Sequence, residues 1–438
     1  MSRSGAVGEA QILATGPAGG DHDAPAPRWL IAGGALICAV ALLMGRWSPA
    51  RLFNFPVWET VPWYFDIRPP VVVCGLLIIV ATRSNRPPPV VPRLVTLAVL
   101  FVVLVLLTLP LSADIGGINC QSEYCEQKAI DVLWLACFVF ITFCLAQKPG
   151  FEELFYRWLF VLCMILALLG LRAALATVDP TYKGLTVLEG GRNVYSRILG
   201  VLAILALYYY LAAPRIVPRV FFIGLFGLSL ALLMLTGSRG GTAASLFGLA
   251  VAAIVFRAPL RGVVAIGAAI GVGLLLAVES GLLDIFARYI TDRYVEGVFG
   301  QLYLSNRDTL LMAGLALWSD HPLWGGGLGR FAELNTLSYP HNIFVELLAE
   351  TGVVGTLLVL LPVVFLLAFI RQHWAAVDKR GVAVFTVYLV AAQVSGDIYD
   401  SRALILIPVV AACSVVARRS LQNRTTSLWS QSPAGKPA

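Results

Sequence analysis

Apolar runs close to twenty residues long recur along most of the chain, and this feature constrains the fold most strongly. A helix of about 20 apolar residues is long enough to cross the hydrocarbon core of a bilayer. Twelve runs approach this length, at approximately residues 29–45, 69–82, 93–112, 129–147, 158–177, 198–213, 219–236, 242–256, 262–279, 352–370, 381–396 and 403–417. The sequence therefore predicts an all-α polytopic membrane protein with about twelve transmembrane helices.

The charge content supports this class. Only 13% of the 438 residues are charged, whereas soluble proteins carry about 25%. The deficit extends along the whole chain, which argues against a large soluble core. The net charge of +7 lies largely in the connectors, and the sequence contains no nucleic-acid-binding motif. We therefore expect membrane lipid headgroups, and not nucleic acid, as the partners of this charge.

The basic connectors predict the orientation, because cytoplasmic loops of membrane proteins are enriched in Lys and Arg. With the N-terminus inside, every inner connector is basic; these residues are Arg83, Arg86, Lys148, Arg157, Arg215, Arg219, Arg257, Arg261, Arg371, Lys379, Arg380, Arg418 and Arg419. Residues 1–27, rich in Gly, Ala and Pro, are predicted to be a disordered cytoplasmic tail. Residues 418–438 are predicted to be a second cytoplasmic tail.

One long stretch, residues 281–351, interrupts the apolar pattern. It separates nine predicted spans in residues 28–280 from three in residues 352–417, and the predicted orientation places it outside. It contains His321 and His341, two of the four histidines of the chain. The other two lie in the N-terminal tail and on the inner side. An imidazole general base on the outer face must therefore be His321 or His341.

His341 is the stronger candidate because of its local sequence. The stretch from Tyr339 to Asn342 is predicted to open a helix that runs to Glu350, and Pro340 suits a first helical position. The helix dipole disfavours an imidazolium at this end, so the ring of His341 should stay neutral and able to accept a proton. The alternative is a structural histidine.

Several arginines oppose the positive-inside bias. Arg192 and Arg197 precede the sixth span, Arg239 follows the seventh, and Arg307 lies in the first turn of a helix predicted to run to Ser319. The planar guanidinium donates two hydrogen bonds to a phosphate and stays charged, and helix N-termini also favour anions. These residues are therefore candidate phosphate ligands, although the first two could simply belong to a basic loop.

Arg239 and a further arginine, Arg288, have structural alternatives. An arginine near membrane depth is costly without a partner, and for Arg239 that partner could be a substrate phosphate or a carboxylate such as Glu279 or Asp397. Arg288 lies on a predicted amphipathic helix over residues 281–297, where it could bind a phosphate or pair with acidic residues one turn away. The run Gly325–Gly329 is predicted to be a flexible turn and only weakly indicates a phosphate loop.

The cysteines indicate no metal site. Six of the eight lie in apolar segments, where cysteine packs as a small hydrophobic residue. Cys120 and Cys125 share a polar loop in which a disulfide is one of two open alternatives. The spacing matches no zinc motif.

The outer stretch also resembles a known family. His341-Asn342 is followed after nine residues by Gly352-Val353-Val354-Gly355, and Arg307 to Leu311 fits an Arg-x-x-x-Leu pattern. Arg330 to Leu334 fits the same pattern, which shows that it is not specific alone. The chain resembles the O-antigen ligase and polymerase superfamily of bacterial inner-membrane glycosyltransferases. This resemblance implies a GT-C-like plan with a large helical periplasmic loop between late spans.

The resemblance implies an activity. A ligase would transfer O-antigen glycan from undecaprenyl diphosphate to a hydroxyl of the lipid A–core oligosaccharide, with inversion and without a metal or other cofactor. His341 would be the general base; the residues that would bind the donor are Arg192, Arg197, Arg239, Arg288, Arg307 and Asn342. A polymerase, which extends lipid-linked repeats, is the closest alternative. A transporter of lipid-linked sugars is less favoured, since the charges cluster at the outer face and no internal repeat is evident.

Overall fold

The structure is a computed structural model, and it describes residues 26–44, 67–83, 92–111, 123–176, 184–188, 191–257, 307–335 and 339–431. Every regular element in these ranges is a helix. The helices are α1 (Arg28–Leu43), α3 (Arg68–Ala81), α4 (Arg93–Thr108), η3 (Leu109–Leu111), α6 (Glu123–Ala146), α7 (Phe151–Ala176), α8 (Gly191–Ala212), α9 (Ile216–Leu235), α10 (Arg239–Val255), α13 (Arg307–Asp320), α14 (Arg330–Leu334), α15 (Ile343–Gln372), η5 (Trp374–Ala376), α16 (Lys379–Ala391) and α17 (Ala403–Gln431).

The helices agree with the predicted membrane class. One of the twelve predicted runs, residues 262–279, lies outside the described part, and each of the other eleven overlaps a helix. Six described helices are long and apolar enough to cross a membrane, namely those in α4, α6, α7, α8, α9 and α15. The chain is therefore a multi-pass membrane protein, and the count of twelve spans stays a prediction.

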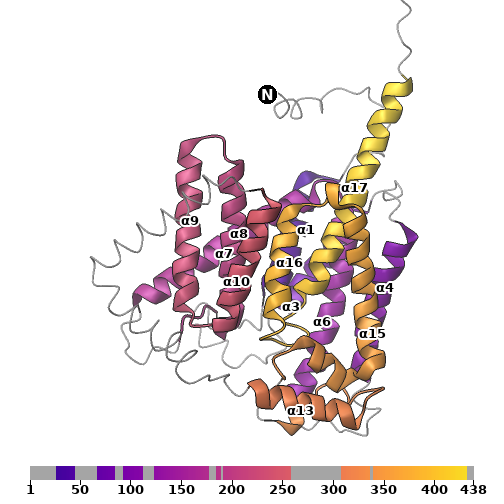
Figure 1. The fold of residues 1–438 in the computed structure, drawn as a ribbon. Helices are drawn as coiled ribbons and strands as arrows, with labels where there is room; N and C mark the ends of the chain where they lie inside the picture. The colour runs from indigo at the N-terminus through magenta and orange to yellow at the C-terminus, as the bar shows by residue number, and fades with distance from the viewer. Residues whose placement is uncertain are drawn as a thin grey trace, which may run out of the picture.

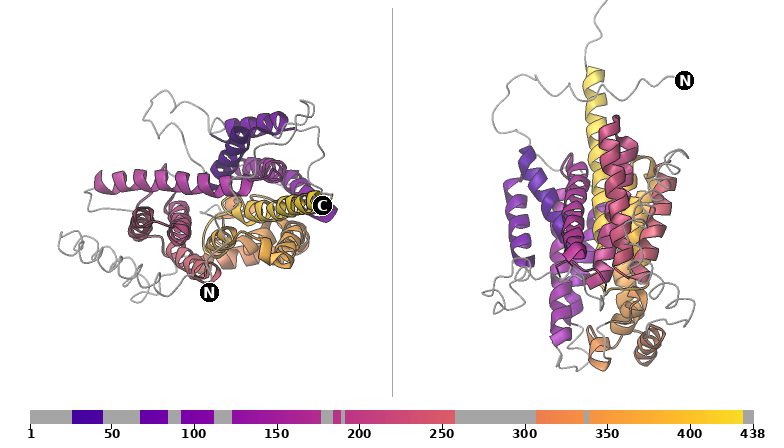
Figure 2. Two further views of the ribbon diagram at one scale, coloured as in Figure 1. Left: turned by 90° about the horizontal axis from the view of Figure 1, so that it is seen from above. Right: turned by 90° about the vertical axis from the view of Figure 1, so that its left-hand side faces the viewer.

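The long helices form a bundle with two distinct ends (Figure 1). Helix α13 lies across one end, whereas the last turns of α17 project from the other. The views in Figure 2 show α7 inclined to its neighbours and α8, α9 and α10 grouped beside it. We call the end with α13 the site end, and the end from which α17 projects the opposite end.

Small residues on α10 bring three helices close together. Helix α10 packs between α8 and α16. A side chain at Gly241 would collide with the Ser196 hydroxyl on α8, and one at Gly248 would collide with Val387 on α16. Small residues allow this approach of helix backbones, and it places the first turns of α8 and α10 side by side at the site end.

Predicted inner connectors meet at the opposite end. Lys148 Nζ donates a hydrogen bond to the carbonyl of Thr82 at 2.7 Å. Arg380 Nη2 lies 2.5 Å from Glu153 Oε2 at the start of α7, and Arg418 of α17 pairs with Glu152. These predicted inner connectors therefore lie together at one end of the bundle. The compartment that each end faces stays a prediction.

Two helices extend beyond the predicted apolar runs. Helix α17 continues to Gln431, so the predicted tail after residue 417 begins as helix. Cys125 lies in the first turn of α6 rather than in a loop, and Cys120 lies outside the described residues. The predicted helix over 281–297, which carries Arg288, and most of the predicted tail over 1–27 also lie outside the described part.

Candidate functional site

The beginnings of three helices bring arginines together at the site end. Arg192 is the second residue of α8, and Arg239 and Arg307 are the first residues of α10 and α13. Burial lowers the pKa of the Arg307 guanidinium, and the positive charges of Arg239 and Arg192 lower it further. A Cβ added at Gly240, in the first turn of α10, would lie 3.5 Å from Arg307 Nη1. The three arginines predicted from separate segments thus form one cationic cluster, which we call the arginine cluster.

The arginine cluster concentrates positive charge at one end of the bundle. Each of its members lies in the first turn of a helix, where the macrodipole already contributes positive charge and disfavours cations. The three guanidinium groups also repel one another. An anion at this point would meet both the guanidinium donors and the helix N-termini. The arrangement is therefore suited to a multiply charged anionic group.

A hydrogen-bonded cap fixes the first turns of α8 and α10 against each other. The Ser238 hydroxyl accepts a hydrogen bond from the Gly241 amide at 3.1 Å and caps α10. The same hydroxyl donates to Asn193 Oδ1 at 2.7 Å. Asn193 directly follows Arg192, and Ser238 directly precedes Arg239. Neither residue of this pair was among the predicted site residues, although a serine before a helical run is a usual N-cap signal.

His341 lies beside the arginine cluster. Burial lowers the pKa of its imidazole to about 4, and the positive charge of Arg307 contributes to the decrease. The Tyr339 ring packs edge-on against it, with 4.7 Å between ring centroids. Nδ1 of His341 is buried and has no hydrogen-bond partner among the described residues. At neutral pH the ring is therefore uncharged and can accept a proton.

The helix after His341 begins later than predicted. Helix α15 begins at Ile343, and Asn342 is its N-cap. Asn342 Oδ1 accepts hydrogen bonds from the amides of Phe344 at 3.0 Å and Val345 at 3.2 Å. His341 thus precedes the cap, with φ 61°, a left-handed conformation that is uncommon outside glycine. Burial and Arg307 keep the imidazole neutral, whereas the predicted cause was the dipole of a helix that began at His341.

Asn342 has a structural role that the prediction of substrate binding did not include. Besides capping α15, its Nδ2 lies 3.4 Å from both the carbonyl and the side-chain oxygen of Gln393. The Ile343 amide donates to the Ala392 carbonyl at 3.0 Å. These contacts attach the turn that carries His341 to the end of α16.

Arg197, predicted as a phosphate ligand, is engaged with backbone carbonyls in the structure. Its guanidinium is buried and donates to the carbonyls of Ser395 at 2.7 Å and Asp400 at 3.2 Å. It therefore holds the connector between α16 and α17. Both carbonyls lie about two hundred residues further along the chain, and the basic local sequence contained no sign of them.

The glycine run after α13, predicted to be a flexible turn, forms backbone hydrogen bonds to α15. We call the contacts of residues 322–327 with residues 349–354 the glycine clasp. Helix α15 breaks at Gly352, where φ is 64° and ψ is −171°, and a helix break exposes backbone donors and acceptors. The amides of Gly326 and Gly327 donate to the carbonyls of Ala349 and Glu350 at 2.8 and 3.0 Å. On the other side of the break, the amides of Val353 and Val354 donate to carbonyls of residues 322 and 323 at 2.9 and 3.1 Å. These glycine amides therefore hold the break in α15.

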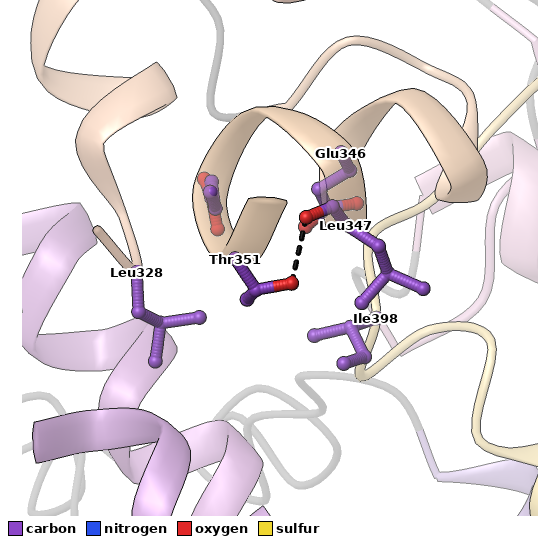
Figure 3. Close-up of a pocket in the computed structure, with 6 residues that line it drawn as sticks. Leu328, Glu346, Leu347, Thr351 and Ile398 are labelled. Carbon is purple, nitrogen blue, oxygen red and sulfur yellow. Dashed lines mark hydrogen bonds between the residues drawn. The ribbon is translucent and has the colours of Figure 1, made fainter. Parts of the chain in front are cut away.

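A buried ion pair lies behind the same part of α15. Lys128 Nζ of α6 lies 2.5 Å from Glu346 Oε1 and 2.7 Å from Glu350 Oε1. Figure 3 shows the small cavity beside them, which is also lined by Leu328, Leu347, Thr351 and Ile398. Asp397, considered above as a partner of Arg239, acts electrostatically on Lys128 and Glu346. Lys128 was not among the predicted site residues, although a lysine at the start of an apolar run is unusual and often has a partner.

The described residues contain no group of three or more His, Cys, Asp or Glu that could hold a metal ion. Residues 224–360 match the sequence model of a protein family described as O-antigen ligase. The match includes Arg239, Arg307 and His341, whereas Arg192 precedes it. No curated protein sequence matches the chain.

Proposed function

We propose that this chain is a glycosyltransferase that uses a lipid-linked glycan, because residues 224–360 match the family model described as O-antigen ligase. In this proposal it transfers O-antigen glycan from undecaprenyl diphosphate to a hydroxyl of the lipid A–core oligosaccharide. The observation that carries the proposal is the neutral imidazole of His341 beside the arginine cluster. The protein would lie in the bacterial inner membrane with both termini in the cytoplasm and the site end toward the periplasm.

The arginine cluster would bind the diphosphate of the donor. Negative charge grows on the leaving diphosphate as its bond to the anomeric carbon breaks. Positive groups that are already in place stabilise this charge most in a partly buried site. Arg192, Arg239 and Arg307 would supply that charge without a divalent cation, and Arg288 stays a candidate fourth arginine.

His341 would be the general base. The acceptor hydroxyl oxygen forms a bond to the anomeric carbon while its proton moves to the imidazole. The bond to the diphosphate breaks, and the leaving group departs with the electron pair. Attack from the face opposite the diphosphate inverts the anomeric centre. General base catalysis typically contributes about 10²–10⁴-fold to the rate.

The acceptor separates this proposal from its nearest alternative. A polymerase would use the same donor chemistry but would transfer the glycan to another lipid-linked repeat. The decisive experiment supplies purified protein with lipid A–core and undecaprenyl-diphosphate glycan and separates the products by mass. Joined lipid A–core glycan is the expected product. Exclusive formation of longer lipid-linked glycan would replace the ligase proposal with the polymerase.

A transporter of lipid-linked sugars is the alternative from another class. It would need the cationic site for binding but no general base. Transport of a fluorescent lipid-linked glycan across proteoliposomes should therefore be absent for the wild-type protein. Transport that persists in His341→Ala would contradict a transferase.

A further inference from the structure

Lys128 connects α6 to the part of α15 that directly follows His341. It lies 222 residues before Glu350 in the chain. The exposed fractions are 4% for Lys128 and 1% for each of Glu346 and Glu350. An ion pair buried this completely is not screened by solvent.

The two carboxylates determine how this part of α15 is rotated. Glu346 and Glu350 are four residues apart, so they lie on one stripe of the helix. A single ammonium can contact both only when that stripe faces α6. A rotation of α15 by one residue, about 100°, would turn both carboxylates away from Lys128.

The segment that these glutamates belong to is short and held at both ends. It runs from the cap at Asn342 to the break at Gly352, and a helix of this length is marginal on its own. The end of α16 holds its beginning and the glycine clasp holds its end. Lys128 contacts Glu346 and Glu350 in the middle of the segment. His341, whose left-handed backbone requires support from its surroundings, directly precedes this segment.

A contribution to folding stability does not by itself explain why this ion pair is buried here. Desolvation of the charges commonly cancels their attraction, and apolar residues of similar volume are often as stabilising. Buried ionic groups are better suited to selecting one arrangement over others. Both oxygens of Glu346 are buried without a hydrogen bond among the described residues, and Oε1 has only the ion-pair contact with Lys128. The cluster therefore favours a particular geometry more than it contributes to stability.

We propose that Lys128 is a positioning residue: through Glu346 and Glu350 it sets the rotation of the segment after Asn342 and thereby directs His341 toward the arginine cluster. This inference rests on the proposed function, in which His341 is the general base.

The test neutralises the lysine and both glutamates together, so that neither the ammonium nor the two carboxylates are left without their partner. Lys128→Met, Glu346→Gln and Glu350→Gln are combined in one full-length protein, since Lys128→Met alone can fail to fold. Retention on size-exclusion chromatography and donor binding establish that the variant is folded. We expect kcat to fall about 10²-fold, the effect of a small misplacement of a reacting group, while the Kd for the donor stays within about threefold because the arginine cluster is intact.

The pH profile distinguishes positioning from a general loss of structure. If the segment turns, His341 becomes more hydrated, and the acid limb of kcat/KM should move from about pH 4 toward the ordinary imidazole value of about 6.5. Lys128→Arg keeps the charge and should recover part of kcat.

The matched control neutralises the cluster at the opposite end by combining Arg380→Met with Glu153→Gln and Asp378→Asn. This control should change thermal stability but not the acid limb. A folded Lys128 triple variant with wild-type kcat and acid limb would overturn the inference while His341→Ala remained inactive. Full activity of His341→Ala would instead overturn the proposed function.

Discussion

The two ends of the bundle use arginine differently. At the opposite end, Arg380 lies 2.5 Å from carboxylate oxygens of both Glu153 and Asp378, and its guanidinium stacks 4.7 Å from the ring centres of Tyr156 and Tyr208. At the site end, Arg307 instead feels the positive charges of two further arginines. Arginines that face carboxylates hold helices together. Like-charged arginines at helix N-termini are the arrangement on which the proposed binding of a diphosphate rests.

The largest effect should come from His341→Ala, which tests whether the site end carries chemistry. We expect kcat to fall by about 10²–10⁴-fold, the usual contribution of a general base. Donor affinity, measured by binding of undecaprenyl diphosphate, should be nearly unchanged. His321→Ala is the matched control, because this histidine is exposed at the turn that ends α13. Equal losses in both variants would contradict a specific role for His341.

Arg380→Ala tests whether the arginine at the opposite end has a structural role. Asp378 is mostly buried and would keep only the more distant Arg418 at 3.8 Å, whereas Glu153 is 43% exposed and would keep Arg157 at 2.8 Å. The cost should therefore lie below the value of about 3–5 kcal/mol for breaking a fully buried ion pair. We expect a marked decrease in the thermal unfolding temperature in detergent. The folded fraction should bind donor with wild-type affinity. A specific loss of donor binding would show that the ends are not functionally distinct.

Arg307→Ala and Arg192→Ala should weaken donor binding. A hydrogen bond to a charged group contributes about 1.5–3 kcal/mol, so each Kd should rise roughly tenfold or more. Arg330→Ala is the control, because Arg330 pairs with Glu333 at 3.3 Å. Unchanged affinity in both variants would remove the arginine cluster from the donor site.

Gly352→Ala should weaken the backbone hydrogen bonds of the glycine clasp and lower the stability of the site end. Alanine is strained at φ 64°, and its methyl group would collide with the Leu323 carbonyl. Strained backbone of this kind costs about 1–3 kcal/mol, and the collision adds to it. Urea unfolding of the site end, followed by hydrogen exchange of the residue 343–352 amides, should report the loss. Gly224→Ala is the control, since its added methyl would meet nothing within 4 Å.

The smallest effect is a shift in the pH profile. His341 is a base only when neutral, so activity should persist at neutral pH and fall as the pH decreases through about 4. Arg307→Gln removes one cause of the low pKa, so the acid limb should move upward. The limb should stay below the ordinary value of about 6.5, because the ring remains buried. A limb that does not move would show that Arg307 and His341 are not electrostatically coupled.

Local sequence patterns predicted much of this protein. Apolar runs identified the helices, because hydrophobic length is a property of neighbouring residues. The sequence predicted Arg307 in the first turn of a helix running to Ser319, and α13 runs from Arg307 to Asp320. Local rules also explain the errors. Pro340 suited a helix start, but the side chain of Asn342 caps the chain two residues later and leaves His341 outside the helix.

The sequence by itself determined the helices, the membrane class and the candidate arginines and histidine. Tertiary structure decided which of these residues meet. Arg192 and Arg197 are five residues apart and have the same chemistry, yet one joins the arginine cluster and the other binds the carbonyls of Ser395 and Asp400. Lys128 likewise acquires its role only where α6 packs beside α15. Hydrophobicity is additive along a chain, whereas a charged site depends on distances between helices, and those distances are set by packing.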